Sequence, residues 1–477
     1  MKLKYSDISI QTVFVTILTV FCQVLPMSVT AKDLPVLNIF FDGELDNSEY
    51  RYGRMELTDN GKTTLLPAKF KTRGATALHY TMKPSMNMKL RNVDDTEIDS
   101  SLLGIRHSSS WILDAMAIDR INMRNRVCMD IWNRMYRLPY NTDFNGRCGT
   151  DGRFVEVFVN GIYKGIYCLS DRVNRKLLNL KKTSASDESA TIRGVLYKHG
   201  TNDYENQNTP GYFCDSTVFI PQWHDAWELT YPDDYAGGKA WAPLAEYYRN
   251  QKDFSYIESH FDYNNVLHYT LFVMALGISD NWGNKNQFWS VRNITKENWK
   301  FIISPWDLDT SLGGHYNGNY HDGIYNMEFT PEVVIHTAIM PFSSFFVHKN
   351  MKEDLKNLWL GYRESVLSPD SVAQRLYAYC DLFEGCGAWA DQYNYWQTFK
   401  YKPQMIPDLR REVQLIIEWY QNHCDSMDKY FGIETTGINL VKEKDGGHGQ
   451  YYDLNGNRYD YRPKGIYIHS GHKYIGR

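Results

Sequence analysis

Two short segments in the second half of the chain, residues 279–286 and 301–314, place carboxylates and carboxamides at the ends of apolar elements. Mg²⁺ prefers oxygen ligands, and one or two carboxylates together with nucleotide phosphates commonly complete its coordination. If the two segments converge in space, they predict a metal-dependent phosphoryl-transfer site. The side chains that would supply it are Asp280, Asn284, Asn286, Asp307 and Asp309.

Asp280 comes at the end of a strongly apolar stretch, residues 264–278, whose composition predicts a buried helix. In kinases an aspartate of the catalytic loop orients the acceptor hydroxyl, and an asparagine that follows it binds a metal. Asp280 fits the first role, and Asn284 and Asn286 both fit the second. A turn in which these side chains bond the local backbone is the competing interpretation.

Asp307 follows a predicted buried strand, residues 299–303, and precedes Gly313, which frees the backbone. The metal-binding aspartate of kinases has the same place after a strand. Asp309 is a second metal ligand or a helix cap. A calcium loop would need an oxygen donor where Leu308 stands, so the sequence favours Mg²⁺ or Mn²⁺ over Ca²⁺.

Cations that steady the phosphates should come from the strand-rich first half of the chain. Alternation along residues 86–90 places the apolar side chains on one face and Lys89 on the other. Lys83 and Arg73 are further candidates, and Glu156 on another predicted strand would pair with such a lysine. For each of them, a solvated surface charge is the alternative.

Apolar patterns predict mainly strands between residues 34 and 200 and mainly helices after residue 256. Asn160-Gly161 favours a hairpin, because both residues tolerate positive φ. The predicted fold class is α+β, with a strand-rich N-terminal half, a helix-rich C-terminal half and a cleft between two lobes. The expected strands are 36–41, 65–72, 86–90, 154–159, 163–169 and 194–198. The expected helices are 121–135, 264–278, 351–366, 371–382 and 408–430, followed by a short β hairpin within 451–468.

Composition excludes several classes of protein. The 477 residues are enough for one large or two medium domains, and the formal net charge of −4 argues against nucleic acid as a partner. The 35 Tyr and 13 Trp would suit a glycan or peptide groove, although exposed apolar surface is normal. The sequence contains no Walker-type GxxxxGK[ST], kinase GxGxxG, GxSxG or HExxH motif.

The N-terminus has the layout of a secretory signal peptide. Lys2 and Lys4 precede an apolar run over residues 13–25, and small residues before position 32 favour cleavage after Ala31. An uncleaved membrane anchor is the alternative, and we expect no later membrane span. The predicted domains are a signal peptide at 1–31, a main domain at 32–431 and a linker with a small β tail at 432–477.

With these features the sequence resembles the CotH kinase family, named after a bacterial spore coat protein. The likeness extends in order over roughly residues 35–430, and its most specific pieces are the hairpin NGxYxGxY at 160–167 and the DxD segment at 307–309. The C-terminal tail resembles short terminal modules of exported Bacteroidetes proteins. The other matching segments include Arg73-Gly74, 83–90, 111–125, 194–198 and 280–286.

The resemblance implies an atypical kinase with a diverged, two-lobed, protein-kinase-like fold. Such proteins use ATP and a divalent metal to phosphorylate Ser or Thr of secreted or surface proteins. By the same resemblance, Asp280 is the catalytic-loop aspartate, and Asn286 and Asp307 are metal ligands. The nucleotide-binding residues, with the cations already named, are Lys89, Lys83, Arg73, Glu156 and Lys198.

We therefore expect an exported, ATP-dependent kinase whose partners are a nucleotide and a secreted or surface protein acceptor. A non-catalytic pseudokinase scaffold that binds a glycan or a protein is the alternative, because ATP is scarce outside the cytoplasm. Two departures from the family pattern are visible. Ordinary kinases place the asparagine five residues after the catalytic aspartate, whereas Asn284 and Asn286 follow Asp280 by four and six residues. Ser170-Asp171 stands where family members often have Glu after the second hairpin strand, which leaves the role of that position open.

Overall fold

The computed structural model describes residues 34–433 and 451–476 with several gaps. The predicted signal peptide and Asn284 fall outside the described residues. The segments left out are 75–80, 141–142, 144, 185–190, 200–226, 234–237, 282–285, 315–340, 454–457, 460–464 and 470–471.

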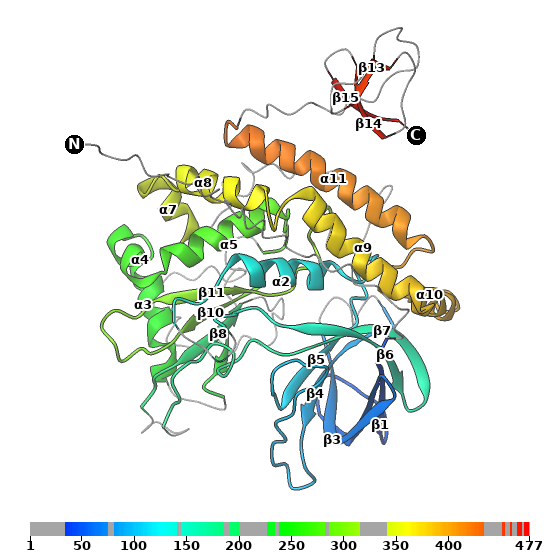
Figure 1. Cartoon of the computed structure of the whole chain (residues 1–477). Coiled ribbons are helices and arrows are strands. Elements are labelled where there is room, and N and C mark those ends of the chain that lie inside the picture. Colours follow the sequence, from blue (N-terminus) through cyan, green and yellow to red (C-terminus); the bar gives the residue numbers. More distant parts are fainter. Residues whose placement is uncertain are drawn as a thin grey trace, which may run out of the picture.

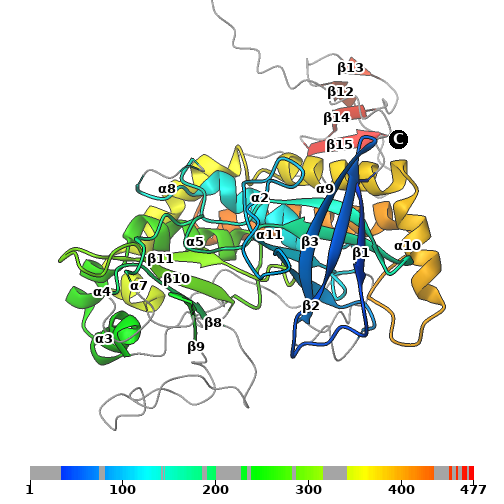
Figure 2. The same ribbon diagram turned by 90° about the horizontal axis from the view of Figure 1, so that it is seen from below.

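Seven strands of the first half close into a barrel (Figures 1 and 2). Neighbours around the barrel run antiparallel in the order β1-β2-β3-β4-β5-β7-β6, and a parallel pairing of β6 with β1 closes it. The strands are β1 (Val36–Phe41), β2 (Arg51–Asp59), β3 (Lys62–Arg73), β4 (Ser85–Leu90), β5 (Ser110–Asp114), β6 (Gly152–Val159) and β7 (Ile162–Ser170).

Strict alternation of side chains explains the interior of the barrel. On β4, Met86, Met88 and Leu90 belong to the buried barrel core, and the side chain of Lys89 between them is half-buried on the outer face. The turn between β6 and β7 is made by Asn160-Gly161, with φ of 49° and 78°. Both residues therefore adopt the left-handed conformation that the hairpin prediction required.

A second sheet lies beside the barrel, in the order β11-β10-β8-β9. Its neighbouring strands are all antiparallel. All residues of the two strands β10 and β11 are buried, and they contribute to a second hydrophobic core separate from that of the barrel. The four strands are β8 (Val195–His199), β9 (Trp227–Tyr231), β10 (Gln287–Val291) and β11 (Phe301–Pro305).

Helices cover the second sheet on one side. Figure 1 shows α2 and α5 above it, with α8, α9 and α11 as an outer layer. Among the described residues, no helix is both long enough and apolar enough to cross a membrane. The helices are α2 (Arg124–Met135), α3 (Ala242–Asn250), α4 (Phe254–His260), α5 (Tyr263–Ala275), α7 (Phe342–His348), α8 (Met351–Arg363), α9 (Pro369–Gly385), α10 (Ala388–Gln397) and α11 (Leu409–Tyr430).

The α+β class, with a strand-rich first half and a helix-rich second half, is confirmed. Two features differ from the expectation. The first-half strands form a closed barrel, and the C-terminal tail contains a four-stranded antiparallel sheet in place of a single hairpin. The tail strands are β12 (Tyr451–Asp453), β13 (Arg458–Tyr459), β14 (Gly465–His469) and β15 (His472–Gly476).

Helix α10 lies beside the barrel (Figure 2), and the fully buried amide of Gln392 is one of the groups that attach it there. Its Oε1 accepts hydrogen bonds from the Ile166 backbone N–H at 2.9 Å and from Lys83 Nζ at 2.8 Å. Its Nε2 donates to Asn122 Oδ1 at 2.9 Å. Gly165 makes room for this amide, since a Cβ there would lie 2.6 Å from Gln392 Oε1.

We predict that Gly165→Ala destabilises the fold by about 1–3 kcal/mol, because Gly165 has a φ of 93° and the added methyl overlaps the Gln392 amide. Urea unfolding measures the free energy. Gly361→Ala on α8 is the matched control: its new Cβ meets nothing within 4 Å, and it should stabilise the helix by about 0.5–1 kcal/mol. Equal effects of the two substitutions would contradict the close approach.

Candidate functional site

The antiparallel pair β10 and β11 brings the two acidic segments together. Gln287 at the start of β10 pairs with Pro305 at the end of β11, so the residues just outside the ladder meet at one edge. There the Trp306 N–H donates to the Asn286 carbonyl oxygen at 3.0 Å. The end of segment 279–286 therefore lies beside Trp306 in segment 301–314.

The chain after α5 is bonded to the same edge. The Ser279 N–H donates to the Thr310 carbonyl oxygen at 2.9 Å, and the Leu312 N–H donates to the Leu276 carbonyl oxygen at 2.8 Å. A buried side chain, that of Asn281, completes the junction. Its Nδ2 donates to the carbonyl oxygens of Asn286 at 2.8 Å and Trp306 at 2.7 Å.

Asp280 and Asn286 contact each other directly. Asn286 Nδ2 donates to Asp280 Oδ2 at 2.8 Å, which fixes the orientation of that carboxylate. Asn286 is buried and has a φ of 51°, a backbone conformation that non-glycine residues adopt rarely and often at functional sites. The amide nitrogen is thus used for Asp280, which leaves Asn286 Oδ1 as the atom that could bind a metal.

Asp307 also has a left-handed backbone, with a φ of 58°. Asp307 is exposed to solvent, although many protein atoms lie near its carboxylate. Desolvation, followed by the charges of Asp280 and Asp114, raises the pKa of Asp307 to about 6. Desolvation and then the charge of Asp307 raise the pKa of Asp309 well above its ordinary value. Four carboxylates therefore share one small region.

Asp114, which the sequence analysis did not single out, belongs to this region. It is the last residue of β5, and its Oδ2 accepts from Asn125 Nδ2 at 2.8 Å. Asn125 Oδ1 in turn accepts from the Leu308 N–H at 3.3 Å, next to Asp307. A carboxylate at the end of the apolar run Trp111–Leu113 is the signal that could have identified it, as it identified Asp307.

The carboxylates would suit a metal ion that binds together with a nucleotide. Within the described ranges, no three His, Cys, Asp or Glu side chains converge closely enough to hold a metal ion by themselves. Mg²⁺ at nucleotide sites needs only one or two carboxylates. Desolvation and then neighbouring carboxylates raise the pKa values of Asp307 and Asp309, so a bound cation would relieve the repulsion between them. These two residues and Asn286 Oδ1 fit such an ion.

Cations lie near the carboxylates, around a small cavity of about 30 Å³. Arg73 at the end of β3 and Lys198 on β8 line it, and their charges oppose the rise in the pKa of Asp307. Arg172, which directly follows Asp171, lines the cavity as a third cation. The aromatic walls are Phe288 and Trp306.

The sequence matches the family described as CotH kinase protein over residues 70–427, about three quarters of the chain. The chain belongs to the CotH kinase family. A comparison with curated proteins finds no relative. The matched range contains the last residues of β3, the later barrel strands, the second sheet and nearly all of α11, and so includes every residue that contributes to the site.

In this CotH-family protein, the predicted nucleotide-binding residues fall into two groups: a first group that lines the cavity and a second group that does not. Arg73 and Lys198 line the cavity. Lys89 does not line it, and its Nζ lies 4.7 Å from the ring centre of Tyr50 on the outer face of the barrel. Glu156 accepts a hydrogen bond from the Tyr163 hydroxyl at 2.9 Å.

Lys83 is also in the second group, because it is fully buried and its ammonium is saturated. Nζ donates to the carbonyl oxygens of Ala115 at 3.0 Å and Ile166 at 2.7 Å and to Gln392 Oε1 at 2.8 Å. No proton is left for a phosphate. The lysine instead joins β7, the chain after β5 and α10.

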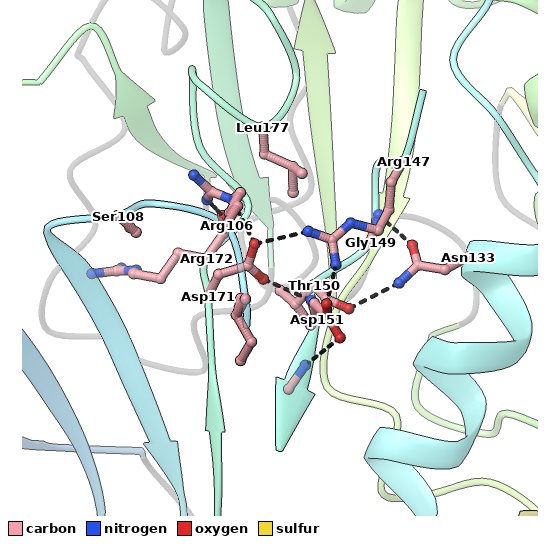
Figure 3. Close-up of polar contacts among 12 residues, drawn as sticks. Arg106, Ser108, Asn133, Arg147, Gly149, Thr150, Asp151, Asp171, Arg172 and Leu177 are labelled. Atoms are coloured by element: carbon pink, nitrogen blue, oxygen red, sulfur yellow. Dashed lines mark hydrogen bonds and ion pairs between the residues drawn. The ribbon is translucent and has the colours of Figure 1, made fainter. Parts of the chain in front are cut away.

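Asp171, at the position where family members often have Glu, is a buried structural anion (Figure 3). Its Oδ2 accepts from Arg106 Nε at 2.5 Å and from Arg147 Nη2 at 3.2 Å, and its Oδ1 accepts from the Asp151 N–H at 2.7 Å. Asp171 therefore holds the end of β7 against the start of β6. The shorter side chain still finds two arginine partners.

We predict that Lys83→Met destabilises the protein by about 2–4 kcal/mol, because three buried acceptors lose their shared donor. The affinity of the folded fraction for ATP should stay unchanged. Urea unfolding and calorimetric titration of ATP measure the two quantities. Exposed Lys62→Met is the control and should change the stability by less than about 0.5 kcal/mol. A variant of normal stability that no longer binds ATP would restore Lys83 as a nucleotide ligand.

A second prediction concerns the junction of the two acidic segments. Asn281→Ala removes both donors to the Asn286 and Trp306 carbonyl oxygens and should destabilise the protein by about 1–3 kcal/mol. It should also weaken binding of Mg²⁺ and ATP, since Asp280 and Asp307 lose their fixed separation. Thermal shift with and without Mg²⁺ and ATP tests both effects. Exposed Asn92→Ala should alter neither, and equal ligand shifts in all three proteins would refute the proposed link.

Proposed function

We propose that this CotH-family protein is an exported, metal-dependent kinase that transfers the γ-phosphoryl group of ATP to Ser or Thr hydroxyls of a secreted or surface protein. The observation that carries the proposal is the hydrogen bond from Asn286 Nδ2 to Asp280 Oδ2, in a region that also holds Asp307 and Asp309 and faces a cation-lined cavity. Acid, amide and cation are the groups that phosphoryl transfer needs.

Asp280 would orient the acceptor hydroxyl and take up its proton as the bond to phosphorus forms. Asn286 holds the Asp280 carboxylate in place for this role. Arg73 and Lys198 would bind phosphate oxygens and stabilise the charge of the departing diphosphate. A divalent metal on Asp307, Asp309 and Asn286 Oδ1 would supply further neutralisation of the phosphate oxygens.

Two wider features belong to the same proposal. The barrel and the helical half, each with its own hydrophobic core, would act as the two lobes of a kinase-like fold, with the site where they meet. Export would depend on the predicted signal peptide at residues 1–31 and would put the acceptor outside the cytoplasm.

We predict that Asp280→Asn and Asp307→Asn each lower phosphoryl transfer by about 100-fold or more while the protein stays folded. Transfer of labelled phosphate from ATP with Mg²⁺, to the protein itself and to a general acceptor, measures the activity. Asp59→Asn at the partly exposed end of β2 is the control for loss of one carboxylate and should keep full activity.

Asp307→Asn should in addition reduce the rise in melting temperature that Mg²⁺ and ATP cause, because a ligand of the native state stabilises it. A wild-type protein that gives neither transfer nor a thermal shift at millimolar ATP would support the non-catalytic scaffold instead. Wild-type activity in both aspartate variants would remove these residues from the mechanism.

A further inference from the structure

The cavity beside the acidic segments carries an excess of positive charge. Arg73, Arg172 and Lys198 line it, and the only carboxylate among its described lining residues is Glu228. Glu228 Oε2 lies 3.7 Å from Lys198 Nζ, a partial pairing at the cavity edge. Two arginine charges therefore remain without a lining carboxylate.

Among the described residues that line the cavity, Arg73 contributes a buried donor without an acceptor. Its guanidinium lies 5.0 Å from the ring centre of Trp306, and its buried Nη1 has no hydrogen-bond acceptor within the described part of the chain. A buried donor without an acceptor costs free energy unless a ligand supplies one. Desolvation and then the charge of Arg172 lower the pKa of Arg73 to about 10, so the two guanidinium groups lie close together.

Arg172 is held at the cavity by its backbone and not by its side chain. Figure 3 shows its side chain directed away from the buried cluster of Asp171, Arg106 and Arg147. Arg106 Nη2 donates to the Arg172 carbonyl oxygen at 2.8 Å and to Asn174 Oδ1 at 3.2 Å, which fixes the main chain on both sides. Among the described residues, the Arg172 guanidinium has no hydrogen-bond or ion-pair partner of its own.

We infer that Arg172, with Arg73 and Lys198, binds the phosphate chain of the nucleotide. The inference rests on the proposed kinase function and adds to it the residue that makes the cavity selective for a polyphosphate over an uncharged nucleoside. Two guanidinium groups and one ammonium around a single cavity match a ligand with several negative charges. A guanidinium can bind two phosphate oxygens at once, which a lysine at this position cannot do.

Calorimetric titration of the full chain with ATP and Mg²⁺, inorganic triphosphate and adenosine tests the inference. Arg172→Ala should weaken binding of ATP and of triphosphate by about tenfold or more and leave adenosine unchanged. Arg172→Lys should recover only part of the loss. Arg54→Ala removes one exposed cation outside the cavity and should bind all three ligands as the wild type does. Circular dichroism confirms that each variant is folded.

The outcomes separate this inference from the kinase proposal. Wild-type protein that binds triphosphate through Arg172 but never transfers phosphate would overturn the kinase function and keep the anion site. Active protein whose triphosphate affinity is the same in both Arg172 variants would overturn the anion site and keep the kinase function. Wild-type protein that does not bind triphosphate would also overturn the inference.

Discussion

The antiparallel pairing of β10 with β11 is the constraint on which the site depends. It ends with Gln287 opposite Pro305, so the candidate site residues Asn286 and Asp307 lie at the same edge of the sheet. Backbone hydrogen bonds set their separation, and the Asn281 amide adds the chain after α5 to the junction. A ladder of buried strands is a rigid support, which suits side chains that must keep a fixed geometry.

Like charges gather on both sides of this junction. On one side, desolvation and then neighbouring carboxylates raise the pKa values of Asp307 and Asp309. On the other side, desolvation and arginine charges lower the pKa values of Arg73 and Lys198. Each group alone is unfavourable, because like charges in a partly desolvated region repel. A ligand that combines phosphates with a divalent metal would neutralise both groups at once. The repulsion within each group of like charges thus supports a ligand with phosphates and a metal more directly than any single residue does.

Local sequence patterns predicted many helices and strands correctly, but they predicted less well which side chains are buried. Strands β1, β4 and β6, helices α5 and α11, and the hairpin at Asn160-Gly161 follow from local patterns, and so does Asp307 after its strand. Closure of the barrel could not be predicted, because it depends on a parallel pairing between strands far apart in the chain. Lys83 looked equivalent to Lys89 for a related reason. Only tertiary contacts show that three buried acceptors saturate it.

The site also depends on the C-terminal helices, which explains the extent of the family match. On α11, the Trp419 ring would lie 3.2 Å from a Cβ at Gly313, and His423 Nε2 lies 2.7 Å from the Met274 carbonyl oxygen, so one helix contacts segment 301–314 and the helix α5 that precedes segment 279–286. The match begins at Phe70 in the barrel core and ends at Met427 in the helical core. Because both cores hold site residues in place, a shorter unit would lose the support for either its cations or its carboxylates.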